Sequence, residues 1–225
     1  DYMRSAIRHS ALMGVPVTYI MTHDSLQVGQ DGPTHQPVEH LASLRAMPNL
    51  VVYRPAEANE TIVAWKLAVE SKNRPFLIAL GRHDVPAIAD VKIEGAERGG
   101  YILSKDSDTA DIILIATGSE VEMALKAKEQ LNQYTVNVVS LPSWELFDAQ
   151  SQEYKDSVLP PSIDNKLSIE LGSTLGWSKY VGAKGKSIGV EQFGKSGPAN
   201  ELLAEYDFTV ERIVKEALKL MEQNK

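Results

Sequence analysis

Short apolar runs alternate with helical patterns along almost the whole chain, and this alternation constrains the fold more than any other feature. In the first half, apolar runs at residues 17–21, 50–53 and 76–80 are separated by segments with helical spacing at 37–47 and 60–71. Strands and helices that alternate over such lengths predict parallel sheets joined by right-handed crossovers. The expected fold class is therefore α/β, with mainly parallel sheets.

The alternation resumes after an irregular stretch. Residues 81–100 contain Pro86 and a charged run with three glycines at 94–100, which is typical of a linker. Beyond it, we expect strands at 112–116, 136–141, 167–171 and 188–190, and helices at 120–131, 152–158, 198–206 and 209–222. The pattern thus predicts two three-layer α/β units, residues 1–95 and 96–225.

The ends of two helices allow finer expectations. The chain opens at Asp1 and Tyr2 inside a helical pattern without an initiator methionine, so we expect the first unit to be truncated at its N-terminus. Thr209 is expected to cap the last helix. For the helix at 60–71, the expected buried side consists of Ile62, Trp65, Leu67 and Val69.

Composition excludes several classes of protein. The formal net charge of -7 argues against nucleic-acid binding, which requires clustered Lys and Arg. The chain has no cysteine, so it has neither a disulfide framework nor a thiolate metal site, and we expect a reducing, cytoplasmic setting. No apolar run approaches the roughly 18 residues of a membrane-spanning helix, so we expect no membrane association.

The loop THDSLQVGQDGPTHQP, residues 22–37, carries the densest set of polar side chains. It contains His23, Asp24, Asp31, His35 and Gln36 and follows a predicted strand, at the sheet edge where parallel folds bind ligands. Imidazole and carboxylate groups exchange hydrogen bonds with hydroxyls and carbonyls, and imidazole carries a proton near neutral pH. The loop therefore predicts a site for a polyhydroxylated substrate; a metal site at His23, Asp31 and His35 is the alternative.

Other polar residues also follow predicted strands. Arg82 comes directly after the strand at 76–80, so its guanidinium should emerge beside the loop, where it can hold a phosphate or form a surface ion pair. Thr117, Gly118 and Ser119 open a helix and can either bind an anion or cap that helix, which is the favoured alternative. Glu170, Glu191, Gln192 and Phe193 are interpreted as packing or subunit-contact residues, and His9, His40 and His83 receive no role.

These motifs resemble a known family. THDSLQVGQDGPTHQPVEHLASLRAMPNL, with YRPAEANET and LIALGR, is similar to the transketolase pyrimidine-binding domain. ATGSEVEMAL, VVSLPSWELFDAQ, YKDSVLPP and FTVERIV resemble the transketolase C-terminal domain. The resemblance covers nearly the whole chain and implies transfer of two-carbon ketol units between sugar phosphates in the pentose phosphate pathway, with thiamine diphosphate as electron sink.

The resemblance also implies roles for individual residues. His23 and Arg82 match positions that contact the substrate phosphate, and Asp31 matches the residue that reads hydroxyl stereochemistry. His35 matches the catalytic histidine beside the reacting oxygens, and Tyr2 matches the last aromatic residue around the pyrimidine ring of the cofactor. Gln30 and Gly81 depart from the residues that are commoner in the family, Glu in the first case and Ser or Thr in the second.

The family's remaining cofactor machinery has no counterpart in this sequence. The glutamate that activates the pyrimidine and the domain that binds diphosphate and Mg²⁺ are expected outside the chain, so no metal ligand is assigned and the isolated chain is expected to be inactive. The intact enzyme is expected to be a homodimer. A non-catalytic assembly or regulatory module and a dihydroxyacetone synthase relative remain the alternatives.

Overall fold

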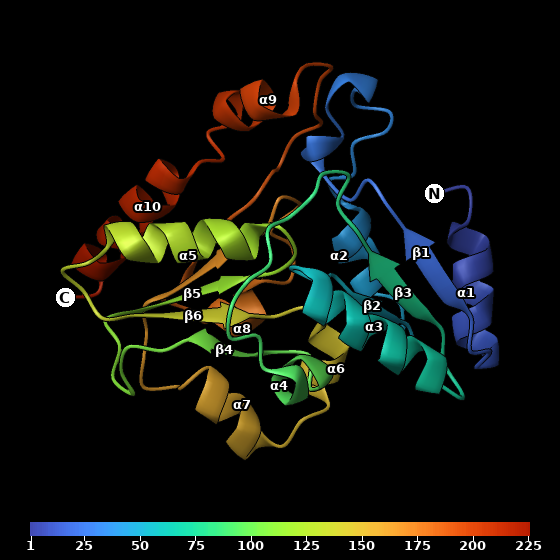
Figure 1. The fold of residues 1–225 in the computed structure, drawn as a ribbon, viewed down its shortest axis with the longest axis horizontal. Helices are drawn as coiled ribbons and strands as arrows, with labels where there is room; N and C mark the ends of the chain where they lie inside the picture. Colours follow the sequence, from blue (N-terminus) through green and yellow to red (C-terminus); the bar gives the residue numbers. More distant parts are fainter.

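Two sheets, one from each half of the chain, organise the fold (Figure 1). The computed structural model describes all residues from Asp1 to Lys225. The first sheet is entirely parallel with the order β1–β3–β2, formed by β1 (Thr18–Met21), β2 (Val51–Tyr53) and β3 (Phe76–Ala79). The second has the order β4–β6–β5–β7–β8, formed by β4 (Tyr101–Ser104), β5 (Ile112–Ala116), β6 (Val136–Ser140), β7 (Lys166–Ile169) and β8 (Lys186–Ile188). The mainly parallel α/β class is thereby confirmed.

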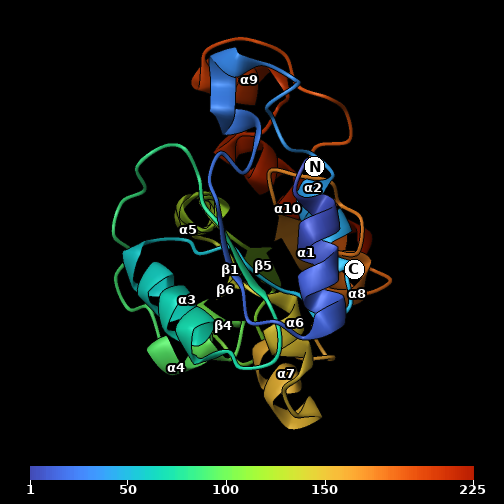
Figure 2. The same cartoon turned by 90° about the vertical axis from the view of Figure 1, so that its right-hand side faces the viewer.

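Helices cover both faces of the first sheet. Helix α3 (Ala58–Glu70) packs on one face, and α1 (Arg4–Met13) and α2 (His40–Arg45) pack on the other, as the views in Figures 1 and 2 show. Helix α1 ends at Gly14, whose φ of 67° is the left-handed conformation that glycine adopts readily. The first unit therefore has three layers.

The second sheet is enclosed in the same way. Helices α5 (Glu120–Gln130) and α10 (Val210–Gln223) pack on one face, and α6 (Trp144–Asp148), α7 (Gln152–Val158) and α8 (Ser178–Val181) pack on the other. All five residues of β5 are buried and apolar, as expected for a central parallel strand that is covered on both sides. Helix α10 begins after Thr209, whose hydroxyl accepts a hydrogen bond from Arg212 N, which confirms the predicted cap.

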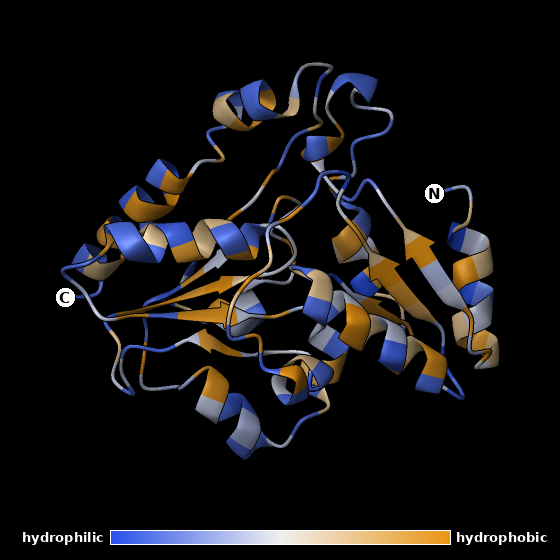
Figure 3. Cartoon of the chain, viewed as in Figure 1, coloured by the Kyte–Doolittle hydropathy of each residue, from blue (hydrophilic) through white to orange (hydrophobic).

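The two units share one hydrophobic core. A single cluster of 33 buried residues includes Val51, Tyr53 and Phe76 of the first sheet together with Leu114 and Ile213 of the second unit. Figure 3 shows that the strands of both sheets consist mainly of hydrophobic residues. The predicted boundary near residue 95 stays a prediction, because the core runs across it. None of the helices combines the length and apolarity that a membrane span requires.

Several elements differ from the sequence-based expectations. Strand β4 was not expected; it pairs antiparallel with β6 at the sheet edge, with a register shift after Ile102. Helix α4 (Ile93–Glu97) lies within the stretch that was expected to be an irregular linker. Helix α2 begins at His40 rather than at Pro37. Short elements of four to six residues carry too few periodic positions to be recognised.

The expected buried side of α3 was wrong for three of its four residues; the fourth, Leu67, is half-buried and packs against the core. Ile62, Trp65 and Val69 are 64%, 45% and 70% exposed, whereas Val63, Ala64 and Ala68 are buried. Apolar residues lie on both sides of this helix, so their periodicity does not identify the buried face. The smaller side chains allow the helix axis to approach the sheet and α4 closely, which favours burial of that side.

A buried carboxylate joins the units beneath α3. Glu60 Oε1 accepts hydrogen bonds from Tyr101 Oη (3.0 Å) and Ser140 Oγ (2.6 Å), and Oε2 accepts one from Ala56 N (2.7 Å). Burial raises the pKa of Glu60 above its ordinary value of 4.5. The contribution of this group to stability is therefore complete below pH 4.5 and is lost as the pH rises through the folded-state pKa.

We expect Tyr101→Phe to lower the free energy of unfolding by about 1.5–3 kcal/mol, because the phenol donates to a buried carboxylate. The loss should be larger at pH 7 than at pH 4.5, because removing a donor to the ionised Glu60 raises its pKa further. Urea denaturation at both pH values measures this difference. Tyr134→Phe is the control, since the Tyr134 hydroxyl makes no hydrogen bond; equal losses in both variants would contradict the assignment.

Candidate active site

The ends of β1 and β3 bring the polar loop and Arg82 to the same edge of the first sheet. The two strands are parallel neighbours in which Met21 lies opposite Ala79. The pairing extends one residue further, where Leu80 N donates to Met21 O at 2.8 Å. The chain therefore leaves both strands side by side, as the sequence predicted for Arg82 and the loop after β1.

The loop has a defined internal conformation. Its centre is the 3₁₀ helix η1 (Leu26–Asp31), which begins after Ser25, whose hydroxyl accepts from Gln27 N at 3.3 Å. Gly29 and Gly32 each have a φ of 80°, a value that glycine adopts without a steric penalty. The two glycines thus allow the chain to kink at Gly29, inside η1, and to end this helix at Gly32.

Segments of the second unit hold this loop in place. Gln36 is buried, and its Nε2 donates to Leu26 O (3.4 Å), Gly29 O (2.9 Å) and Lys195 O (3.0 Å). Ser196 Oγ donates to Gln30 O at 2.6 Å. Helix α9 (Ala199–Glu205) consequently lies beside η1, as both Figure 1 and Figure 2 show.

The structure distributes the predicted site residues over two cavities. Tyr2 and His23 line a cavity of about 300 Å³ between α1, α2 and the ends of β1 and β3. Asp31 and Arg82 line a second cavity of about 260 Å³, which Pro198 of the second unit helps to close. All four predicted residues are solvent-exposed.

His35 lines neither of these cavities. Its side chain is exposed, and its Nδ1 lies 2.8 Å from Thr34 Oγ1. His83, which received no role from the sequence, lines the same cavity as Asp31 and Arg82, and its Nε2 lies 2.9 Å from Gln27 O. The structure thus brings together Tyr2 with His23, and Asp31 with Arg82, but not all five predicted residues.

The alternative of a metal site in the loop has no support from the geometry. The one group of three metal-ligating side chains whose ligand atoms lie within 4.8 Å of one another is Asp1, Glu39 and His40. His23, Asp31 and His35 do not form such a group. The loop therefore offers hydrogen-bonding side chains rather than a preformed set of ligands.

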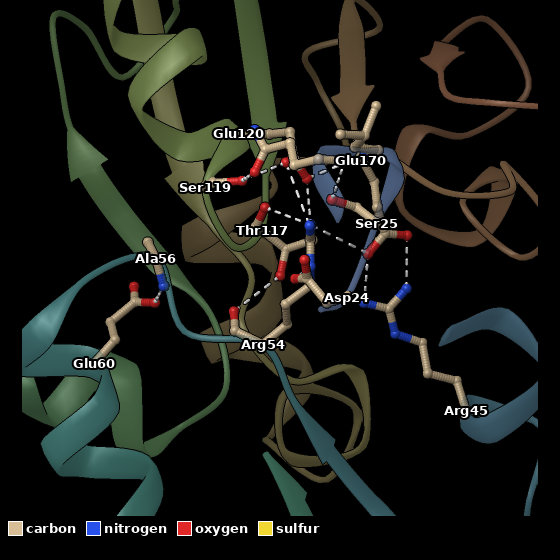
Figure 4. A network of polar contacts seen from close by, with 12 residues as sticks. Asp24, Ser25, Arg45, Arg54, Ala56, Glu60, Thr117, Ser119, Glu120 and Glu170 are labelled. Atoms are coloured by element: carbon tan, nitrogen blue, oxygen red, sulfur yellow. Dashed lines mark hydrogen bonds and ion pairs between the residues drawn. The ribbon is translucent and has the colours of Figure 1, made fainter. Parts of the chain in front are cut away.

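Below the loop, Arg54 forms a buried network of ion pairs (Figure 4). Its Nε donates at 2.7 Å to Oδ2 of Asp24, the residue that follows His23 in the chain. Its two terminal nitrogens donate to the carboxylate of Glu120, and Nη1 also donates to Thr117 O at 3.0 Å. One guanidinium therefore links the loop of the first unit to the start of α5 in the second.

A second arginine completes the network. Arg45 of α2 donates from both terminal nitrogens to the two oxygens of Glu170, each at 2.8 Å, and Trp177 Nε1 donates to the same carboxylate. Burial opposes the ionisation of Glu170, yet Arg45 and Arg54 outweigh it and lower its pKa. At Glu120, burial outweighs the effect of Arg54 and raises the pKa.

These contacts bear on two expectations from the sequence. No side-chain hydrogen bond caps α5, so the favoured role of the turn at Thr117, Gly118 and Ser119 is not seen. Instead, a Cβ at Gly118 would lie 2.6 Å from Arg54 Cζ, so the guanidinium fills this space. Glu170 joins the two units within one chain, and Glu191 accepts from Thr174 N within the second unit.

Sequence reasoning did not identify Arg54 or Glu120. Arg54 follows β2 directly, just as Arg82 follows β3, so the rule that selected Arg82 applies equally to Arg54. What the sequence does not reveal is that Arg54 is completely buried whereas Arg82 is exposed. That difference depends on how the second unit packs over the end of β2.

We expect Gln36→Ala to increase amide hydrogen exchange at residues 26–31 about 5- to 30-fold, because three carbonyl oxygens lose their common donor. Mass spectrometry of the labelled peptides measures this rate. Gln30→Ala is the matched control: its side chain is exposed and makes no hydrogen bond, so exchange should not change. The same rate in Gln36→Ala and the unmodified chain would show that Gln36 does not hold the loop.

Comparison with known protein families yields two adjoining matches. Residues 1–87 match the transketolase pyrimidine-binding domain, and residues 99–209 match the transketolase-like C-terminal domain. Among curated relatives, transketolase of Geobacillus stearothermophilus is 51% identical over 98% of this chain and 34% of its own length. A chloroplastic transketolase of Craterostigma plantagineum is 54% identical over 98% of this chain and 43% of its own length.

Solved structures give the same result. A transketolase of Pichia stipitis in complex with sedoheptulose 7-phosphate is 46% identical, with a TM-score of 0.93 over 98% of this chain and 32% of its own. A split-gene transketolase, described as an inactive β4 tetramer, is 25% identical, with a TM-score of 0.75 over 92% of this chain and 67% of its own. This chain spans about a third of the length of several relatives that it matches. The chain belongs to the transketolase family and contains its pyrimidine-binding and C-terminal domains.

Proposed function

We propose that this chain is the substrate-facing part of a transketolase that moves a two-carbon ketol unit from a ketose phosphate to an aldose phosphate in the pentose phosphate pathway. The observation that carries the proposal is the joint position of the loop at residues 22–37 and Arg82 at the adjacent ends of β1 and β3. Polar and cationic groups that gather at the carboxyl ends of parallel strands favour a sugar phosphate as ligand. Among the relatives, the Pichia stipitis enzyme has been solved with sedoheptulose 7-phosphate, which supports this substrate class.

Each predicted residue has a role that its chemistry allows. Arg82 and His23 bind the phosphate, and Asp31 in the cavity beside Arg82 accepts a hydrogen bond from a substrate hydroxyl. His35 is the proposed catalytic residue: its exposed imidazole exchanges a proton with a substrate oxygen whose charge changes during the reaction. The Nδ1 of His35 lies beside Thr34 Oγ1, which leaves Nε2 for the substrate.

The cavity beside Tyr2 fits the pyrimidine end of thiamine diphosphate. Its walls include the apolar residues Met21, Leu77 and Ala79, and the phenol ring of Tyr2 is fully exposed at its mouth. A flat heterocycle can stack on such a ring and pack against such walls. When bound, the cofactor supplies the electron sink for the two-carbon unit. Tyr2 would therefore help to hold and orient the cofactor.

We further propose Mg²⁺ with the diphosphate, held by residues outside this chain, together with a homodimeric assembly in the cytoplasm. The Mg²⁺ and the homodimer rest on the family resemblance alone. A homodimer is also compatible with the exposed apolar residues of α1, Leu12 and Met13. The absence of cysteine and the bacterial relatives support the cytoplasm.

A non-catalytic assembly module is the second candidate function. The matched split-gene transketolase is described as an inactive β4 tetramer, and it aligns with 92% of this chain. That likeness supports a chain of this fold which assembles but does not turn over substrate by itself, although the matched chain extends beyond the aligned part, which covers 67% of it. Both candidate functions predict that the isolated chain is inactive. They differ only in whether the chain serves catalysis within a larger enzyme.

We expect the 225-residue chain alone to transfer no ketol unit from xylulose 5-phosphate to ribose 5-phosphate, because its site residues line separate cavities. The full-length enzyme should catalyse the reaction in the same coupled assay. Adding a separately expressed upstream segment and measuring mass by light scattering tests whether activity and assembly appear together. Turnover by the chain alone would contradict the expectation, and preference for formaldehyde as acceptor would indicate a dihydroxyacetone synthase.

In the full-length enzyme, we expect His35→Ala to lower kcat about 10²- to 10⁴-fold, which is typical of the loss of a general acid or base. Arg82→Ala should mainly raise KM for ribose 5-phosphate, about 10- to 100-fold, because a charge-assisted phosphate contact is lost. Steady-state kinetics with ribose 5-phosphate and with unphosphorylated glycolaldehyde measure the two effects.

Two controls accompany these variants. Glycolaldehyde has no phosphate, so its KM should not change in Arg82→Ala. Lys72→Ala removes an exposed cation near the opposite end of β3 and should leave both constants within about 2-fold of the unmodified enzyme. Unchanged kinetics in both His35→Ala and Arg82→Ala would remove the site assignment.

A further inference from the structure

His23 has an unusual backbone conformation. Its φ is 67°, in the left-handed region, which is uncommon for residues other than glycine. Conformations of this kind persist where the surrounding structure fixes them, and they concentrate at functional sites. The contacts that hold His23 in this conformation therefore matter for the site as well as for the fold.

The residues on either side of His23 are both anchored. On one side, Met21 O accepts a hydrogen bond from Leu80 N at 2.8 Å, which continues the pairing of β1 with β3. On the other side, Asp24 is buried and its Oδ2 accepts from Arg54 Nε at 2.7 Å. Only Thr22 and His23 lie exposed between these anchors.

Arg54 is itself fixed by the second unit. Its backbone N donates to Pro142 O at 2.8 Å, and its terminal nitrogens are engaged with Glu120 and Thr117 O. The Nε is directed at Asp24 alone. A chain of contacts therefore runs from the N-terminus of α5 through Arg54 and Asp24 to His23, and Figure 4 shows its buried part.

We propose that Arg54 is a positioning residue, which acts through Asp24 to hold His23 in its left-handed conformation and so fixes the position of the His23 imidazole at the end of β1, with the second unit setting this position through Glu120. The inference deepens the proposed function and rests on it. It gives the second unit, which contributes no predicted site residue, a defined effect on the geometry of the site.

Two observations favour this over an ion pair that only joins the units. Asp24 lines the same cavity as His23 and Tyr2, although Arg54 does not. Its second oxygen, Oδ1, is buried without a hydrogen-bond partner, and a Cβ at Gly81 would lie 3.9 Å from it. Buried polar atoms are nearly always bonded, so the free Oδ1, on a residue that lines the cavity with His23 and Tyr2, indicates that the carboxylate faces the site as well as Arg54.

A double-mutant cycle in the full-length enzyme tests the proposal. Asp24→Asn preserves shape but loses the charge that Arg54 holds, and it should lower kcat/KM for xylulose 5-phosphate about 10-fold or more. In the His23→Ala background, the same substitution should change kcat/KM by no more than about 2-fold, because there is no imidazole left to position. If Asp24 had only a structural role, Asp24→Asn would lower kcat/KM by the same factor in both backgrounds. That result would overturn the proposal.

Glu145→Gln provides a matched control. Glu145 is a largely buried acid of the second unit that accepts from Val52 N at 3.1 Å, so it also joins the units, but it contacts neither Arg54 nor Asp24. Whatever its effect on kcat/KM, that effect should be the same with and without His23. If the effect of Glu145→Gln on kcat/KM depended on His23 as strongly as that of Asp24→Asn, any change at the contact between the units would have this effect. That result would also overturn the proposal.

A structural readout is independent of turnover. In a crystal structure of the full-length Asp24→Asn variant, His23 should leave the left-handed region, whereas in Glu145→Gln it should keep its φ near 67°. An unchanged φ in Asp24→Asn would contradict the inference even if activity fell. Conversely, a full-length enzyme that transfers no ketol unit would refute the proposed function, while a shifted His23 would still support the positioning by Asp24.

Discussion

The buried guanidinium of Arg54 is the interaction on which the arrangement of the two units depends. Together with Arg45 it faces three buried carboxylates, Asp24, Glu120 and Glu170, so the network contains one excess negative charge. Such a cluster is stable only when each ion keeps its partners, and removing one partner of a buried pair typically costs about 3–5 kcal/mol. Burial raises the pKa of Glu120, whereas Arg45 and Arg54 outweigh burial and lower the pKa of Glu170.

This network explains how a unit without predicted site residues affects the site. The shared hydrophobic core brings the units together without direction, because apolar contact does not specify orientation. The ion pairs of Arg54 and the hydrogen bonds of Gln36 and Ser196 supply that direction. Both sets of contacts end on the loop between β1 and α2, one beneath it and one above it. The loop is therefore held from two sides by the second unit.

The sequence predicted those features that depend on local pattern. Strand β5 and the run at 76–80 are continuous apolar segments, and the adjacency of Arg82 to the loop follows from parallel pairing alone. Strand β4 was not predicted because its partner, β6, lies more than thirty residues away along the chain. Its alternation of buried and half-buried residues also extends over only four positions. The buried side of α3 and the burial of Arg54 depend on long-range packing, which no window of the sequence contains.

The distribution of the site residues separates family membership from activity. Tyr2 and His23 share one cavity, Asp31 and Arg82 share another, and His35 lines neither. Catalysis requires reacting groups within hydrogen-bond distance of one substrate, and these residues do not meet in a single cavity. Relatives about three times as long as the matched segment have additional polypeptide beyond it. The fold of this chain therefore places Tyr2 with His23 and Asp31 with Arg82, but it does not bring the two pairs and His35 into one cavity, so family membership alone does not establish a complete site.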